Sequence, residues 1–178
     1  MEMYTRVLLG NLSLERCKFK KEANLSGSSF DPIARQFLWH QSKDYVHGTG
    51  HGLGFFLNVH EGPQSLSNKN SEVSLKMGMI VTNEPGFYLK DYFGIRIENN
   101  LLVSEDGKES DYFCFENLTL VPYENKLLDL DLISKDMLDY INNYHEKIRN
   151  MLEPLLSDSE EDLIAKDYLI RKTKKISF

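Results

Sequence analysis

The spacing of apolar residues changes twice along the chain, and each change predicts a different kind of element. Apolar residues with a helical period predict a helix from Met3 to Cys17, in which Gly10 is unfavourable. A second helix is expected after Ser29 or Asp31, both suited to capping, with Pro32 in its first turn. The N-terminal part of the chain is therefore expected to be helical.

Strand patterns dominate the middle of the chain, and turn residues such as Pro85-Gly86 separate them. We expect a glycine-rich strand-like segment at 45–58, a polar loop at 61–76, a strand at 79–82, a hairpin pairing 87–89 with 93–103, a tight turn at 105–107, and a last strand at 113–121 with Phe113, Phe115, Leu118 and Leu120 in the core. The hairpin is expected to be antiparallel.

After Pro122 the helical period returns. One stripe carries Met137, Leu138, Ile141, Tyr144, His145, Ile148 and Leu152. A further helix is expected at 161–172, with the acidic run 157–162 capping its start and the basic run 171–175 forming a solvated end. The change of pattern suggests two domains, 1–122 and 123–178.

Composition narrows the class of protein. The chain has 178 residues, 41% hydrophobic and 27% charged, as in ordinary globular proteins. Its net charge of -6 argues against nucleic acid as the main partner. Cys17 and Cys114 form neither a metal-binding pair nor a disulfide framework, and no signal peptide or membrane span is recognisable, so we expect a cytoplasmic protein.

Three polar clusters interrupt the apolar pattern between Tyr45 and Asn99. His47, His51 and His60 lie in and just after a run of four glycines. Glu84 and Glu98 interrupt or end strand-like runs, and a buried carboxylate needs a counter-charge, for which a metal ion is the strongest choice.

Each of these residues taken alone is more often solvated or hydrogen-bonded than metal-binding. Their combination favours a metal site. Arg96 and Glu98 are expected to share one strand face. Arg96 is therefore expected to orient a ligating carboxylate without binding the metal itself.

These residues stand in motifs that resemble the Xaa-Pro aminopeptidases, cytosolic type, a family of pita-bread metallopeptidases. The matching motifs are His47-Gly-Thr-Gly-His51-Gly-Leu-Gly, Phe56-Leu-Asn-Val-His60-Glu-Gly-Pro63, Gly78-Met-Ile-Val-Thr-Asn-Glu84-Pro-Gly and Phe93-Gly-Ile-Arg-Ile-Glu98-Asn. The resemblance implies an α+β, pita-bread (creatinase/aminopeptidase-like) fold that is incomplete: the second half of the catalytic domain with a C-terminal helical extension.

The resemblance also implies residue roles. His51 and Glu84 are expected to bind one metal ion and Glu98 to bridge two, while Glu84 doubles as a candidate general base. His47 and His60 are expected to line the substrate site and to assist proton transfer. Ligands rich in carboxylate fit two divalent ions, with Mn²⁺ favoured and Zn²⁺ or Co²⁺ as alternatives.

The family's site also contains two strand-borne aspartates, and neither Asp31 nor Asp44 fits that pattern. We therefore expect this chain to be a fragment that lacks two metal ligands and is inactive alone. The implied substrates are peptides with proline at the second position, and the implied partner is a second copy or the missing N-terminal portion. Trp39 is the residue expected at such a contact. Two alternatives stay open: a non-catalytic binding or dimerisation module, and a prolidase-type dipeptidase.

Overall fold

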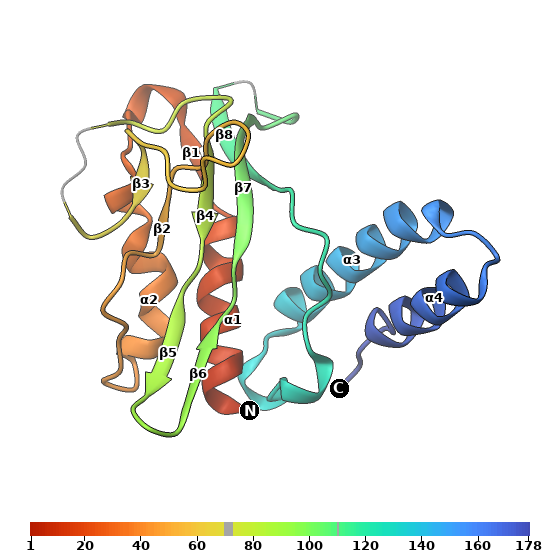
Figure 1. Ribbon diagram of the computed structural model, residues 1–178. Helices are drawn as coiled ribbons and strands as arrows, with labels where there is room; N and C mark the ends of the chain where they lie inside the picture. Colours follow the sequence, from red (N-terminus) through yellow and green to blue (C-terminus); the bar gives the residue numbers. More distant parts are fainter. Residues whose placement is uncertain (70–72, 110) are drawn as a thin grey trace. The chain divides into compact units, whose positions relative to one another are not determined.

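A computed structural model describes residues 1–69, 73–109 and 111–178 (Figure 1). The helices and strands are α1 (Glu2–Glu15), β1 (Lys18–Lys20), α2 (Asp31–Trp39), β2 (Gly50–His51), β3 (Ser65–Leu66), β4 (Ile80–Asn83), β5 (Gly86–Leu89), β6 (Phe93–Arg96), β7 (Asn99–Glu105), β8 (Tyr112–Asn117), α3 (Lys135–Leu152) and α4 (Glu160–Lys172).

The chain divides into two compact units. The sheet unit is Arg6–Thr119, and the helical unit is Leu120–Phe178 together with Met1–Thr5. The domain boundary expected after Pro122 stays a prediction, because a division by contacts does not test whether either part folds alone.

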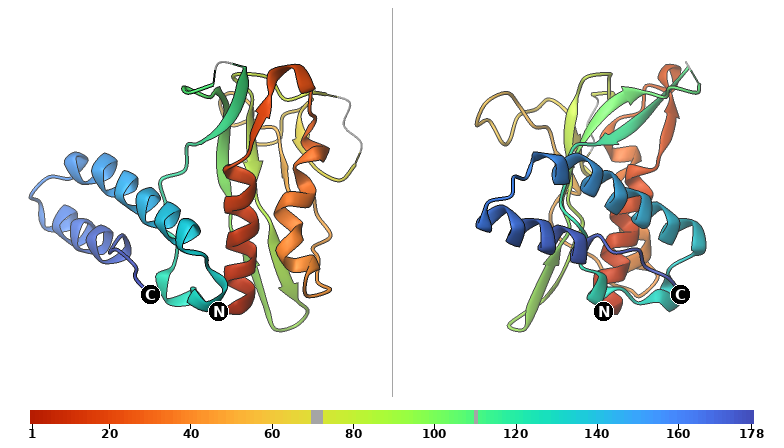
Figure 2. Two further views of the ribbon diagram at one scale, coloured as in Figure 1. Left: turned by 180° about the vertical axis from the view of Figure 1, so that it is seen from behind. Right: turned by 90° about the vertical axis from the view of Figure 1, so that its right-hand side faces the viewer.

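The sheet unit is built on an antiparallel sheet with strand order β1-β8-β7-β4. Strands β5 and β6 form a separate antiparallel pair beyond the ends of β4 and β7. Helices α1 and α2 lie side by side against one face of the strands, and this is visible both from the front and from behind (Figures 1 and 2). The sheet therefore has one face covered by helices.

The core of the sheet unit lies between these helices and the sheet. It contains Leu14 of α1, Ala34 of α2, and, from the strands and loops, Phe19, Phe30, Leu66, Leu75, Val81, Leu101, Val103 and Phe115. The rings of Phe19 and Phe30 meet edge to face with centroids 4.9 Å apart, a favourable aromatic geometry. This burial supplies the main stabilisation of the unit.

The unfavourable glycine in α1 has a packing role. A Cβ on Gly10 would lie 2.1 Å from the carbonyl oxygen of Ala34, so only glycine permits α1 and α2 to approach this closely. The expected helix is confirmed, and the second helix is also confirmed, with Pro32 in its first turn. The expected cap is wrong: Phe30 precedes the helix without a side-chain capping hydrogen bond, and the carboxylate of Asp31 is bound by Arg35. The helix propensity lost at Gly10 is offset by contact with α2.

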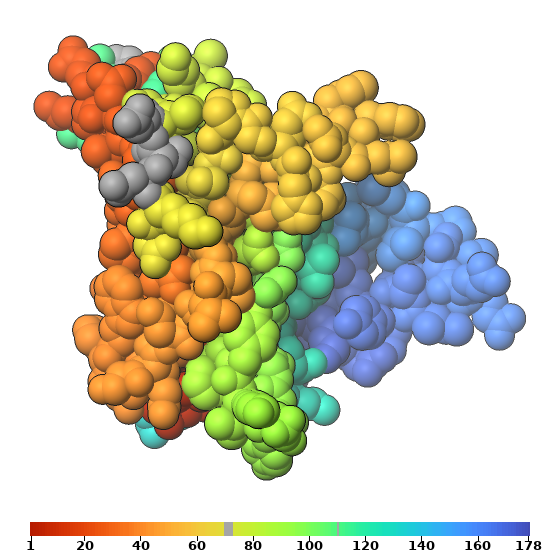
Figure 3. All heavy atoms as spheres, turned by 60° about the vertical axis from the view of Figure 1, so that its left-hand side comes forward, coloured from red at the N-terminus to blue at the C-terminus, as the bar shows by residue number. Residues whose placement is uncertain are grey.

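The strand-like segment expected at 45–58 is largely wrong, because only Gly50–His51 forms a strand there. Phe56 and Leu57 have φ values of 42° and 62°, which a strand does not allow. Residues 55–60 instead form an exposed loop, golden yellow in the space-filling view, that stands out from the surface (Figure 3).

Two further expectations in the middle of the chain need correction. The expected polar loop at 61–76 contains β3, which pairs with β2; its residues 70–72 lie outside the described residues. The expected last strand ends at Asn117, so Leu118 is 42% exposed and not in the core. The alternation of buried and exposed side chains ends at Asn117, where β8 stops pairing with β7.

The helical unit follows the predicted period. Helix α3 begins after Ser134, whose hydroxyl accepts a hydrogen bond from the amide of Met137, and it buries the predicted stripe except Leu152, which is half-buried at the end of the helix. Helix α4 begins after Ser159 and carries acidic residues in its first turn and basic residues in its last. No helix among the described residues is long and apolar enough to cross a membrane.

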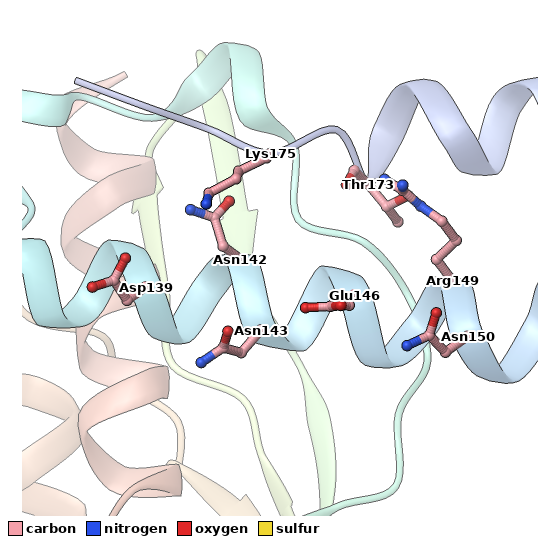
Figure 4. A pocket seen from close by; sticks show the side chains of 8 residues that line it. All are labelled: Asp139, Asn142, Asn143, Glu146, Arg149, Asn150, Thr173 and Lys175. Carbon is pink, nitrogen blue, oxygen red and sulfur yellow. Dashed lines mark hydrogen bonds between the residues drawn. The ribbon is translucent and has the colours of Figure 1, made fainter.

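A polar hollow of about 590 Å³ lies along α3 beside the chain that follows α4 (Figure 4). Arg149 Nε donates to Thr173 Oγ1 at 2.9 Å. The side chain of Asn142 makes two hydrogen bonds with the backbone of Ile176. These side chains hold the C-terminal segment against α3.

Candidate metal centre

Two carboxylates face each other where the long hairpin is interrupted. Asn83 pairs with Asn99 at the ends of β4 and β7, and Gly86 pairs with Arg96 at the ends of β5 and β6. The register is the same on both sides of the gap, which places Glu84 opposite Glu98. Side chains at such positions have Cβ atoms about 5 Å apart, and like charges there repel.

His51 approaches this carboxylate pair from a different segment. One possible ligand atom from each of His51, Glu84 and Glu98 lies within 4.8 Å of the others. Among the described residues, these three form the cluster of side chains that could hold a metal ion. His51 Nε2 is 3.4 Å from Glu84 Oε1. Glu84 is buried, His51 is half-buried and Glu98 is exposed. The site thus opens to solvent on the Glu98 side.

The orientation of His51 suits a metal ligand. Its Nδ1 lies 2.9 Å from the carbonyl oxygen of Gly52, so Nδ1 carries the proton and donates it to that carbonyl. The lone pair of Nε2 is then directed to the carboxylates. Histidine ligands in metal sites commonly have this arrangement, with the second ring nitrogen donating to a carbonyl or carboxylate.

Thr82 joins His51 to Glu84, a role that the sequence analysis missed. Its hydroxyl donates to Glu84 Oε1 at 3.0 Å and accepts a hydrogen bond from the backbone amide of His51 at 2.9 Å. A Cβ on Gly50 would lie 1.7 Å from the carbonyl oxygen of Thr82, so the approach of these segments requires glycine. The signal was available: Thr82 and Glu84 are two residues apart and share a strand face.

Arg96 contacts Glu84, not its expected neighbour Glu98. Arg96 Nη1 is 3.4 Å from Glu84 Oε2, and Arg96 Nε donates to the hydroxyl of Tyr88 at 2.8 Å. The ion pair forms across the hairpin, because the two residues come from opposite arms of it. Arg96 therefore partly balances the charge of the buried carboxylate.

The other two histidines lie near this group, each through a different contact. The ring of His60 stacks at a tilt on that of His51, with centroids 4.2 Å apart. His47 Nε2 lies 2.9 Å from the hydroxyl of Tyr88, which links it to Arg96 and so to Glu84. Tyr88, also missed from the sequence, connects these groups. All five predicted polar side chains thus belong to one neighbourhood.

The segment that carries His47 is held by a buried arginine. Arg35 donates to the carboxylates of Asp31 and Asp44 and to the carbonyl oxygens of Tyr45 and His47. Both upstream aspartates are therefore engaged by Arg35. That neither aspartate is a metal ligand stays a prediction.

The donor set fits one divalent ion. Two carboxylates and one imidazole, with one arginine nearby, leave a net negative charge at the site. Oxygen-rich ligands with one nitrogen suit Mn²⁺, Zn²⁺ or Co²⁺. A second ion would need donors beyond these three side chains.

A carboxylate pair with an oriented histidine is the donor set of a divalent metal site, and the comparisons with known proteins identify the family as metallopeptidases. The model of Metallopeptidase family M24 matches residues 1–105, and that of the C-terminal region of peptidase M24 matches residues 111–176. The chain therefore belongs to metallopeptidase family M24.

Curated relatives are similar over most of the chain. Xaa-Pro aminopeptidase 1 of Dictyostelium discoideum is 44% identical over 164 residues, which are 88% of this chain and 25% of the relative. Aminopeptidase P1 of Lotus japonicus is also 44% identical, over 89% of this chain and 25% of the relative. The chain spans about a quarter of the length of these relatives.

Solved structures show the same fold. The X-prolyl aminopeptidase of Caenorhabditis elegans, described as a cytosolic enzyme with a di-nuclear active site, matches with a TM-score of 0.88 and 34% identity over 98% of this chain and 28% of its own. Prolidase from Pyrococcus furiosus matches with a TM-score of 0.55 and 29% identity over 66% of this chain and 32% of its own. The predicted resemblance and the α+β pita-bread fold, present in part, are confirmed.

Proposed function

We propose that this chain contributes metal-binding and substrate-facing residues to an Xaa-Pro aminopeptidase, which hydrolyses the bond between an N-terminal residue and a following proline. The observation that carries the proposal is the convergence of His51, Glu84 and Glu98 from three separate segments, with ligand atoms within 4.8 Å of one another.

Each of the three would bind the ion in its own way. His51 would bind through Nε2, because Nδ1 is committed to the carbonyl of Gly52. Glu84 would bind with its orientation fixed by the hydroxyl of Thr82 and would also act as general base. Glu98, exposed and opposite Glu84, would bridge to a second ion. A divalent ion held there supplies polarisation of the scissile carbonyl and a bound water of lowered pKa.

The flanking histidines would act on the substrate. His60 is exposed and lies against His51, in position to contact the scissile region and to assist proton transfer. His47 has its Nε2 at the hydroxyl of Tyr88, so a proton exchanged at Nε2 could pass to that hydroxyl. Both rings would line the substrate site.

Three donors support one resident ion in this chain, and Mn²⁺ is proposed because two of the donors are carboxylates. Zn²⁺ and Co²⁺ are the alternatives. Loading of a second ion would depend on ligands beyond His51, Glu84 and Glu98.

The comparisons favour an aminopeptidase over a prolidase. The two curated relatives above, each 44% identical, are named aminopeptidases, and the nematode aminopeptidase matches at 34% identity and a TM-score of 0.88, whereas the archaeal prolidase matches at 29% identity and 0.55. The proposed substrates are peptides with proline at the second position. A cytoplasmic location is proposed because the nematode structure is described as a cytosolic enzyme.

A chimera tests this function. The matched segment of the Dictyostelium relative is replaced by the corresponding part of this chain, and hydrolysis of Arg-Pro-Pro is measured with added Mn²⁺. We expect an active chimera that loses activity on Glu84→Gln and keeps it on Glu116→Gln, an exposed control. A folded, metal-loaded chimera without activity would contradict the proposal.

A further inference from the structure

A single side-chain amide in helix α1 holds both carboxylate-bearing segments. Asn11 is fully buried, and its Nδ2 donates to the carbonyl oxygen of Asn83 at 2.8 Å and to that of Ile97 at 3.1 Å. Asn83 directly precedes Glu84, and Ile97 directly precedes Glu98. Both donors of one amide group therefore fix the backbone immediately before the two candidate ligands.

The remaining polar atoms of Asn11 are also engaged. Its backbone carbonyl accepts from Asn83 Nδ2 at 2.9 Å, and its Oδ1 accepts from Asn99 Nδ2 at 3.2 Å. Asn99 Nδ2 is also 3.1 Å from Glu15 Oε2. Asn83 and Asn99 are the paired residues at which the β4–β7 ladder ends. The helix thus contacts both strands at the edge of the gap.

The break between the β4–β7 and β5–β6 ladders explains why the hydrogen bonds of Asn11 matter. Glu84 and Glu98 lie outside the ladders, between the β4–β7 pair and the β5–β6 pair. In the gap, Ile97 donates its amide to the carbonyl of Pro85 at 3.3 Å, a long hydrogen bond. Glu84 also donates its amide to the carbonyl of Thr49 at 2.7 Å, but that bond does not join the two arms of the hairpin. Two carboxylates facing each other repel, and the long hydrogen bond between the arms would let them move apart. The amide of Asn11 opposes this movement.

We propose that Asn11 is a positioning residue for the metal centre: its amide holds the backbone at Asn83 and Ile97 so that Glu84 and Glu98 stay close enough to bind one ion. Asn11 touches neither the ion nor the substrate. The inference rests on the proposed metal site. If Asn11 only stabilised the core, its replacement would lower stability alone; a positioning role requires that its replacement also change metal coordination.

The test uses the 178-residue chain loaded with Co²⁺, whose visible absorption reports coordination geometry. Asn11→Ala is expected to weaken Co²⁺ binding by about 10- to 100-fold, as loss of groups behind a metal site commonly does, and to alter the absorption band. Leu14→Ala is the control: it opens a cavity in the core near Asn11 along α1 but leaves the amide in place, so it lowers the melting temperature while Co²⁺ affinity and spectrum stay those of the wild type.

If Asn11→Ala fails to fold, Asn11→Ser is used in the same measurement, because serine is small and keeps one hydrogen-bond donor where the amide of Asn11 has two. An Asn11 variant with wild-type affinity and spectrum would overturn the inference. Equal losses of affinity in the Asn11 and Leu14 variants would also overturn it. A wild-type chain that binds no Co²⁺ would instead contradict the metal site itself, and with it the proposed function.

Discussion

Glu84 and Glu98 stand opposite each other in an unbroken register, although neither belongs to a strand. The pairing of Asn83 with Asn99 and of Gly86 with Arg96 fixes this arrangement. Two like charges in these positions disfavour the metal-free fold, and the ion pair of Arg96 with Glu84 offsets part of the repulsion. A bound cation would remove the rest.

Neutralising one carboxylate should therefore have opposite effects with and without metal. Glu98→Gln is expected to raise the free energy of unfolding of the metal-free chain, by less than about 1 kcal/mol, because it removes the repulsion. The same change should abolish the rise in melting temperature that Mn²⁺ gives the wild type. Thermal melts with chelator and with Mn²⁺ measure both effects, and Glu116→Gln is the control. A Glu98→Gln variant still stabilised by Mn²⁺ would show that the ion binds elsewhere.

The isolated chain is expected to hydrolyse Xaa-Pro peptides negligibly. The described residues place three candidate donors at the site, enough for one ion but not for a di-nuclear centre. The measurement is cleavage of Arg-Pro-Pro with added Mn²⁺, followed by chromatography of the products. Turnover of about 1 to 10³ per second, the ordinary range for enzymes, would contradict this expectation.

His145 should make the stability of the chain depend on pH. It is fully buried in α3, and Nε2 accepts a hydrogen bond from the amide of Tyr123 at 3.1 Å. Burial, with a smaller contribution from the charge of Arg149, lowers the pKa of His145 to about 4. The folded pKa lies below the unfolded value near 6.5, so the unfolded state takes up the proton first.

The native state should consequently lose stability as the pH falls from about 6.5 to about 4, by about 3 kcal/mol. His145→Gln removes the titrating group, and its stability should fall less over the same range. Urea unfolding of both chains at pH 7 and pH 4.5 measures the difference. An identical pH dependence of the two would show that His145 does not titrate in this way.

Trp39 is expected to lie at a contact between chains. Its side chain is 45% exposed, and its indole N–H donates to Asp44 Oδ2 at 3.0 Å, so it is not a core residue. Large exposed aromatics often anchor interfaces. Light scattering should show association of the wild type and a folded monomer for Trp39→Glu, with Tyr168→Glu, an exposed aromatic in α4, as the control. A monodisperse wild-type monomer would remove the association claim.

The sequence by itself determined the elements that depend on local chemistry. Pro32 marked the first turn of α2, and the apolar period marked α3 through Ile141 and Ile148. The motifs around His51, Glu84 and Glu98 also indicated the family, because they are long, ordered and correctly spaced along the chain.

Only the tertiary structure decided how these residues meet. The register that sets Glu84 opposite Glu98, the hydrogen bond from the amide of His51 to Thr82, and the amide of Asn11 that reaches both strands all join residues distant in the sequence or set apart by a gap in the ladder. The positive φ values at Phe56 and Leu57, where a strand was expected, show the same limit. Local patterns report the preference of a segment for helix or strand, whereas pairing and hydrogen bonding across the fold depend on which segments pack together.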